Sequence, residues 1–186
     1  MVRITTLGSD EATGRRSALL LPGVNYTAQA PLLYWSTAVL LSAGWHIRIA
    51  DWEEGDRAHA TPQDLIEHVF ELNAAEGAGT LDLVVAKSLG TLALPRCIDE
   101  NIAGVWLTPL LNRSEVAAAL LTADRRHLAV GGTNDRHWIP EAVQGTAAEL
   151  VSVEGADHAL LHDDWRESMR TSNDIAERIA AHLASL

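Results

Sequence analysis

A serine between two small residues directly follows an apolar run near the middle of the chain. The run Leu81–Val85 is typical of a buried strand, and Ser88 comes after it with Ala86 two positions before and Gly90 two positions after. A strand that ends in small-x-Ser-x-small and turns at once into a helix exposes the serine hydroxyl on a tight corner, as a nucleophile requires. An ordinary helix N-cap serine fits the same pattern, so the rest of the chain must decide.

An acid and a base follow two later apolar runs. In the stretch 126–135, a short apolar strand runs into a glycine-rich loop that presents Asp135, and the stretch 149–158 presents His158 in the same way. A nucleophilic serine needs a base that takes its proton, and the histidine needs a carboxylate that holds its tautomer and stabilises its charged form. Ser88, His158 and Asp135 are therefore the candidates for the nucleophile, its base and the acid that orients the base.

Other residues compete for two of these roles. His137 and His162 are alternative bases, but His158 directly follows the last strand and its loop, which favours it. Asp124 is a weaker alternative acid because it precedes its strand. No pattern of metal ligands stands out, because His158 and His162 are four apart without the glutamate of a zinc-protease helix.

With these three residues in this order, the chain resembles a small α/β-hydrolase. The resemblance runs from the strand near Ala18 to the last helix. It implies an α/β fold with a mostly parallel central sheet, helices on both faces and no cap domain. Only Pro109, Leu110 and Leu111 separate the strand ending near Thr108 from the next helix, where larger members insert a lid.

The resemblance also implies an oxyanion hole. Pro22-Gly23-Val24 stands where the family often has His-Gly-x, so the hole would consist of the backbone amides of Val24 and Leu89. Pro22 in place of His and Ala86 in place of the first elbow glycine depart from the family pattern without removing a catalytic group. Four residues are weaker candidates for substrate contact because they lie close along the chain to the predicted site: Asn25, Tyr26, Trp138 and Trp165.

The implied function is hydrolysis of a small ester, thioester or amide through an acyl-enzyme on Ser88, with a small-molecule acyl substrate and no cofactor or metal. Two alternatives stay open: an acyltransferase that uses the same three residues, and a non-catalytic binding or regulatory protein on a hydrolase scaffold. The sequence does not specify the natural substrate or the oligomeric state.

Composition is consistent with one α/β-hydrolase-like domain over residues 1–186. A formal charge of −11, with thirteen arginines and one lysine, argues against a nucleic-acid or anionic-membrane partner. The lone lysine, Lys87, is interpreted as a packing or surface residue. Cys97 is the only cysteine, so a reducing, cytoplasmic setting is expected, and no apolar run approaches the length of a membrane span.

Hydrophobic periodicity and capping signals place the remaining elements. Strands are expected at 2–6, 18–21, 45–50 and 104–108, in addition to those before Ser88, Asp135 and His158. Helices are expected at about 31–43, from 62 onward, at 112–122 with Asn112 and Glu115 at its start, at 140–143 and at 164–183. Parallel strands joined by helices bring their carboxyl ends to one edge of a sheet, where ligands bind.

Overall fold

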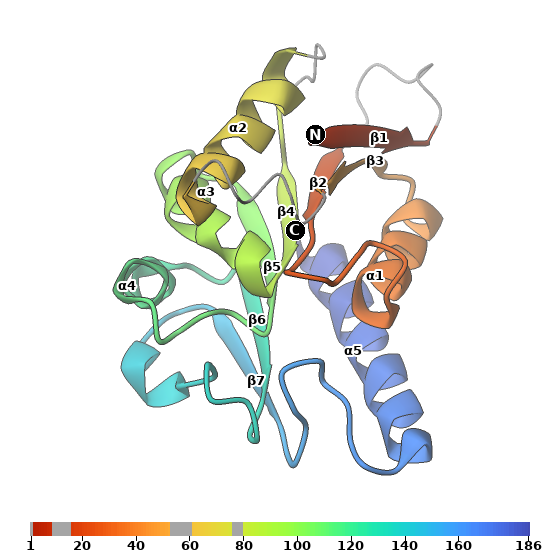
Figure 1. Cartoon of the computed structure of the whole chain (residues 1–186), viewed down its shortest axis with the longest axis vertical. Coiled ribbons are helices and arrows are strands. Elements are labelled where there is room, and N and C mark those ends of the chain that lie inside the picture. The colour runs from red at the N-terminus through yellow and green to blue at the C-terminus, as the bar shows by residue number, and fades with distance from the viewer. Residues whose placement is uncertain (1, 9–15, 53–60, 76–79) are drawn as a thin grey trace.

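A single seven-stranded sheet forms the centre of the molecule (Figure 1). The computed structural model describes residues 2–8, 16–52, 61–75 and 80–186. The strand order is β1-β3-β2-β4-β5-β6-β7; β1 pairs with β3 antiparallel, and every other pair is parallel. The strands are β1 (Arg3–Leu7), β2 (Ser17–Leu21), β3 (His46–Asp51), β4 (Leu83–Lys87), β5 (Ala103–Leu107), β6 (His127–Gly132) and β7 (Glu149–Val153).

Helices cover both faces of this sheet. On one face lie α1 (Pro31–Ser42) and α5 (Trp165–Ser185), which contact each other, and α2, α3 and α4 lie on the opposite face (Figure 1). The bounds of these three are Pro62–Ala75, Leu94–Asp99 and Ser114–Thr122, and 3₁₀ helices occupy Ser88–Ala93 and Pro140–Val143.

The central strands are buried on both sides, which explains their nearly continuous apolar sequences. Every residue of β2, β4, β5 and β6 is buried. Alternate side chains of each strand enter two separate hydrophobic clusters, one under α1 and α5 and the other under α2, α3 and α4. The α/β fold with a mostly parallel sheet, expected from the sequence, is confirmed.

The helix after β5 begins differently from the expectation. Arg113 is its N-cap residue, and the side chain of Asn112 instead contacts the His137 ring, with 2.9 Å between Asn112 Oδ1 and His137 Nδ1. The expectation that this helix starts at Asn112 is therefore wrong. The tertiary contact with the loop after β6 takes the side chain that would otherwise serve as a local cap.

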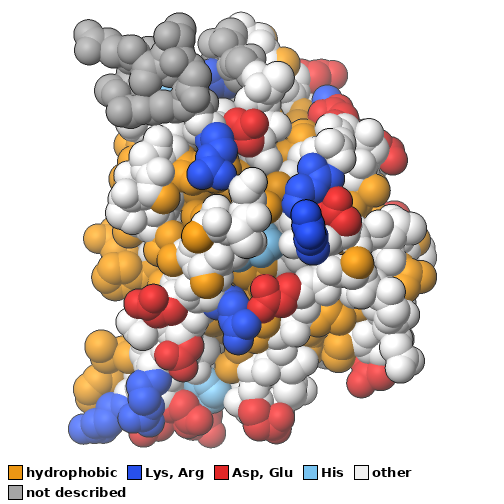
Figure 2. Space-filling model, turned by 180° about the vertical axis from the view of Figure 1, so that it is seen from behind, with side chains coloured by type: hydrophobic (Ala, Val, Ile, Leu, Met, Phe, Trp, Pro, Cys, Tyr) orange, Lys and Arg blue, Asp and Glu red, His pale blue; other side chains and the backbone are white. Residues whose placement is uncertain are grey.

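Charged side chains of both signs are interspersed over the face seen in Figure 2, with apolar atoms between them. Basic groups do not gather into a continuous patch on that face. Within the described part of the chain, no helix has both the length and the apolar composition that crossing a bilayer requires.

Candidate active site

Ser88 occupies a strained corner between β4 and the following 3₁₀ helix. Its φ angle is +51°, in the left-handed region that residues with a Cβ seldom adopt, and its side chain is largely buried. The Thr91 hydroxyl donates to the Ser88 carbonyl over 2.5 Å and accepts from the Leu110 amide over 3.2 Å, which ties the corner to the segment after β5. Backbone strain of this kind persists where the surrounding structure holds it, and it is concentrated at functional sites.

The close approach of Gly90 to β2 explains the second small residue of the motif. The Gly90 amide donates to the Pro22 carbonyl over 3.1 Å. A Cβ added to Gly90 would lie 2.7 Å from the Leu21 Cβ, closer than real Cβ contacts occur, and it would also collide with the Leu21 backbone. The small residue is therefore needed so that the first turn after the nucleophile can pass against the neighbouring strand.

Gly90→Ala is expected to lower the free energy of unfolding by about 1–3 kcal/mol, because the new methyl group overpacks the contact with Leu21. Chemical denaturation of the two proteins measures this. Gly44→Ala is the control: a Cβ there meets nothing within 4 Å, so the variant reports only the cost of its positive φ of 79°, about 1–2 kcal/mol. A Gly90→Ala protein as stable as the wild type would contradict the close approach.

The structure brings Ser88, His158 and Asp135 into one chain of hydrogen bonds. The distance from Ser88 Oγ to His158 Nε2 is 2.8 Å, and that from His158 Nδ1 to Asp135 Oδ2 is 2.6 Å. With Nδ1 protonated, the imidazole donates to the carboxylate and leaves Nε2 free to accept from the serine hydroxyl. This is the tautomer that a histidine needs to remove a serine proton.

Asp135 is held as a buried carboxylate. Its side chain is fully buried, whereas that of His158 is 35% exposed. Burial raises the pKa of Asp135, but the hydrogen bonds from His158 and from the His137 amide outweigh burial, so its pKa lies below the ordinary value. The group therefore stays ionised, as an acid that orients and stabilises an imidazolium must.

The side chains of the competing residues His162, Asp124 and His137 do not take part in this chain of hydrogen bonds. The ring of His162 contacts Thr171 Oγ1 at 2.8 Å on α5, and Asp124 pairs with Arg126 at 2.9 Å. His137 lies beside the trio without joining it: its ring centroid is 5.0 Å from that of His158. Among these alternatives, only His158 connects the serine to a carboxylate.

The loop expected to supply the oxyanion hole lies directly against the elbow. Gly23 and Tyr26 form an isolated antiparallel bridge, so residues 23–26 make a tight turn with Asn25 at a φ of +53°. A Cβ on Gly23 would lie 3.2 Å from the Ser88 Cβ. Val24 follows Gly23 at the tip of this turn, and Leu89 directly follows the nucleophile along the chain.

Trp138 is part of the core. It is 7% exposed, its ring lies against Gly131, and its indole N–H donates to Ser152 Oγ over 2.9 Å. The structure thus assigns Trp138 to packing between β6 and β7, where it supports the strand that precedes Asp135 and does not line an open pocket. Tyr26 is also partly structural, since its hydroxyl accepts from the Leu32 amide over 3.0 Å.

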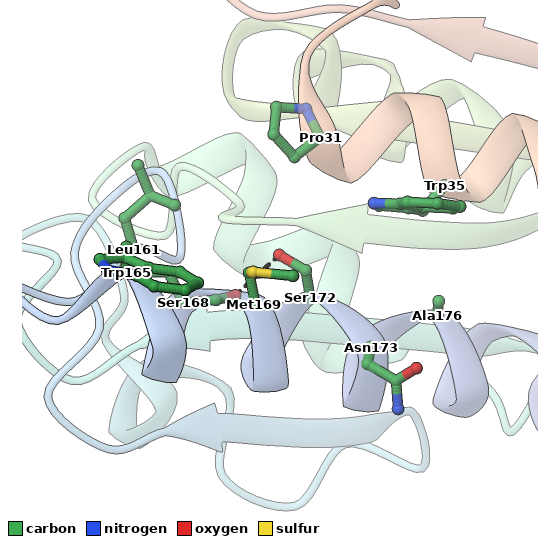
Figure 3. A pocket seen from close by; sticks show the side chains of 9 residues that line it. All are labelled: Pro31, Trp35, Leu161, Trp165, Ser168, Met169, Ser172, Asn173 and Ala176. Carbon is green, nitrogen blue, oxygen red and sulfur yellow. Dashed lines mark hydrogen bonds between the residues drawn. The ribbon is translucent and has the colours of Figure 1, made fainter.

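Trp165 is 60% exposed and lines a shallow groove between α1 and α5. Figure 3 shows Trp165, Leu161 and Met169 on the α5 side of this groove and Pro31 and Trp35 on the α1 side. The groove has a volume of about 480 Å³, and no member of the Ser–His–Asp trio lines it. Trp165 therefore belongs to an apolar surface that is separate from the walls around Ser88.

The segment between β5 and α4 is short and stands at the position where larger α/β-hydrolases insert a lid. It spans residues 108–113, and the Leu111 amide donates to the His137 carbonyl over 3.1 Å. Asn112 adds its contact to the His137 ring. The segment thus fixes the loop that carries Asp135, a role that sequence inspection missed because it depends on contacts across 25 positions of the chain.

Within residues 2–8, 16–52, 61–75 and 80–186, no three His, Cys, Asp or Glu side chains gather as metal ligands would. The groups around Ser88 are those of acid–base and nucleophilic chemistry.

Comparison with known proteins identifies the fold by structure alone. The sequence matches no protein-family model and no curated protein. The structure is similar to that of XC6422 from Xanthomonas campestris, an α/β serine hydrolase without a lid, with a TM-score of 0.67 and 13% identity over 99% of this chain and 88% of that chain.

Two further solved structures agree with this comparison. ATU1826 from Agrobacterium tumefaciens, a putative α/β-hydrolase, has a TM-score of 0.71 and 12% identity over 99% of this chain and 92% of its own. Est1E from Butyrivibrio proteoclasticus, solved with ferulic acid bound, has a TM-score of 0.68 and 14% identity over 98% of this chain and 96% of its own. The chain therefore has the α/β-hydrolase fold in its lidless form, as the sequence resemblance implied.

Proposed function

We propose that this protein is a serine hydrolase that cleaves a small ester, thioester or amide through an acyl-enzyme on Ser88. The observation that carries the proposal is the unbroken hydrogen-bond chain from Ser88 Oγ through His158 to the buried Asp135 carboxylate. The position of Ser88 on a strained strand-to-helix corner supports the proposal further. The structural neighbour XC6422 is an α/β serine hydrolase, which supports hydrolysis in general.

In the first half of the reaction, Ser88 Oγ forms a bond to the carbonyl carbon of the substrate while His158 Nε2 takes the serine proton. Asp135 holds the imidazole in place and stabilises its positive charge. The backbone amides of Val24 and Leu89 donate to the oxyanion of the tetrahedral intermediate. The bond to the leaving alcohol, thiol or amine then breaks, and the leaving group departs with the proton from His158.

In the second half, water attacks the acyl carbon and His158 takes a proton from it. The bond between the carbon and Ser88 Oγ breaks, the serine recovers its proton from His158, and a carboxylic acid leaves. Each group returns to its starting state, and side chains and backbone amides of this chain supply every proton transfer and charge interaction in the cycle.

A fluorophosphonate probe with peptide mapping, followed by a panel of nitrophenyl esters and thioesters, tests the proposal. Labelling on Ser88 together with release of free acid is the expected result. If an added alcohol diverts the acyl group into a new ester at the expense of free acid, the protein is an acyltransferase. Well-folded protein that neither reacts with the probe nor hydrolyses any member of the panel would contradict a catalytic role and favour a binding protein.

The proposed setting is the cytoplasm. Cys97, the only cysteine, is fully buried in α3 and burial raises the pKa of its thiol. A chain with one cysteine forms no intrachain disulfide, which is typical of proteins in reducing compartments.

Short acyl chains are expected to be the better substrates. Only residues 108–113 separate β5 from α4, so no lid is inserted between these two elements to enclose a long chain, and enclosure is the source of apolar binding energy. We expect kcat/KM to fall from acetate to palmitate in a nitrophenyl ester series, without interfacial activation.

The α1–α5 groove provides the control for this expectation. A steady rise of kcat/KM toward palmitate would contradict it. If Trp165→Ala then abolished that rise, long chains would bind along the groove that Trp165 lines.

A further inference from the structure

Lys87 is the only lysine of the chain, although thirteen arginines are present. It directly precedes Ser88 at the end of β4, and it is only 4% exposed. A buried ammonium loses hydration, so its position is costly unless the surroundings compensate. The mechanism proposed above gives this side chain no role.

The side chain of Lys87 touches both ends of the turn 23–26. Its aliphatic part lies against Gly23, since a Cβ on that glycine would be 3.1 Å from Lys87 Cδ. Its Nζ lies 4.7 Å from the centroid of the Tyr26 ring, a cation–π arrangement. Because Gly23 and Tyr26 also pair with each other, one side chain contacts both ends of the turn that carries Val24 at its tip.

Tyr26 transmits this contact to the rest of the fold. Its hydroxyl accepts from the amide of Leu32 in the first turn of α1. The ring of Tyr26 is thus fixed by α1 at one end and offers its face to the Lys87 ammonium. The nucleophile strand, the turn and α1 are therefore linked through two side chains.

Resting on the proposed function, we propose that Lys87 is a positioning residue: its stem on Gly23 and its ammonium on Tyr26 hold turn 23–26 so that the Val24 amide faces the oxyanion formed at Ser88. Oxyanion donors act through fixed placement, so a turn that moves loses transition-state stabilisation without losing substrate affinity. Lys87 does not touch the substrate and acts only through the turn.

The charge of Lys87 makes this role sensitive to pH. Burial lowers the pKa of Lys87 to about 8, and the opposing effects of Asp135 and Asp157, from the loops after β6 and β7, are smaller. His137, on the Asp135 loop, also lies within the field of the ammonium. Burial raises the pKa of Tyr26 above its ordinary value, so the phenol stays neutral over this range. The cation–π contact is therefore present below about pH 8 and lost above it.

The first test measures the contact between Lys87 and turn 23–26 without any enzyme assay. Protein labelled with ¹³C at lysine Cε gives one lysine signal, because Lys87 is the only lysine. We expect an upfield ring-current shift of its ε protons that is lost in Tyr26→Leu and kept in Tyr26→Phe. Amide exchange over residues 23–26 should become about tenfold faster in Lys87→Met and stay unchanged in Lys87→Arg, which keeps a cation over the ring. An unshifted lysine signal, or unchanged exchange in Lys87→Met, would overturn the proposal.

The second test measures the consequence for hydrolysis. With a nitrophenyl ester, kcat of the wild type should fall above about pH 8, whereas Lys87→Arg should keep a plateau because arginine stays charged. Lys87→Met should have about tenfold lower kcat at pH 7 with KM nearly unchanged. A plateau in the wild type, or a Lys87→Met variant within twofold of its kcat, would overturn the positioning role.

The two tests separate this inference from the proposed function. If the lysine shift and the exchange change as expected but no acyl substrate is cleaved, the contact of Lys87 with turn 23–26 stands as a structural contact only. The positioning role of Lys87 is then overturned together with the proposed function. If esters are cleaved on Ser88 and Lys87→Met leaves both exchange and kcat unchanged, the function stands and the inference about Lys87 fails.

Discussion

Ser88→Ala is expected to lower kcat/KM for a nitrophenyl ester by about 10⁶ and to abolish fluorophosphonate labelling. The hydroxyl is the atom that bonds to the acyl carbon, and its oxygen lies 2.8 Å from His158 Nε2, the atom that takes its proton. Residual activity from the oxyanion donors and from binding is the most that should survive.

The fold should survive this substitution. The Ser88 side chain makes its hydrogen bond within the site, so its loss removes little core packing, and circular dichroism with thermal unfolding should be close to those of the wild type. Ser172→Ala, on the α1–α5 groove, is the matched control and should label normally. Labelling that persists in Ser88→Ala would assign the nucleophile to another residue.

The three residues of the site were visible in the sequence because each follows a strand of the parallel sheet. Ser88 and Asp135 follow strands that are buried along their whole length, and His158 follows the partly exposed edge strand β7. Parallel strands that are covered on both faces are continuous apolar runs, and the residue after each run falls at the same edge of the sheet. The sequence alone therefore predicts that Ser88, Asp135 and His158 converge. The distances between them and the burial of Asp135 could not be predicted, because they depend on loop conformations.

What sequence inspection missed depends on contacts between loops. Asn112 looked like a helix cap, yet it contacts His137, and Trp138 looked like a pocket residue, yet it packs on Gly131. Local patterns favour capping and exposure at such positions, and tertiary packing overrides them.

Lys87 shows a different limit of sequence inspection. Its uniqueness among fourteen basic residues was a visible signal. Its position inside a small-x-Ser-x-small motif gave no direction for the side chain, and only the turn 23–26 folded beneath it explains why a lysine is buried there. A single lysine next to the serine motif therefore marks a residue of interest, and only its contacts in the folded protein show its role.

Asp135→Asn is expected to lower kcat by about 10⁴ while leaving the fold intact. Asparagine has nearly the same shape and can still accept from the His137 amide. The amide group that faces His158 Nδ1 donates where the carboxylate accepted, so the imidazole takes the tautomer with its proton on Nε2. That tautomer cannot accept the proton of Ser88, and the stabilisation of the imidazolium is lost as well.

Measurement of kcat for Asp135→Asn and His158→Ala beside Asp124→Asn and His162→Ala tests this assignment. His158→Ala removes the base itself and should cost about 10⁶. The two control variants should stay within a few-fold of the wild type, because Asp124 pairs with Arg126 and His162 contacts Thr171, both away from Ser88. If His162→Ala were the crippling change and His158→Ala mild, the base would have to reach the serine from the segment that precedes α5. The hydrogen bond between His158 and Ser88 would then have no part in the reaction.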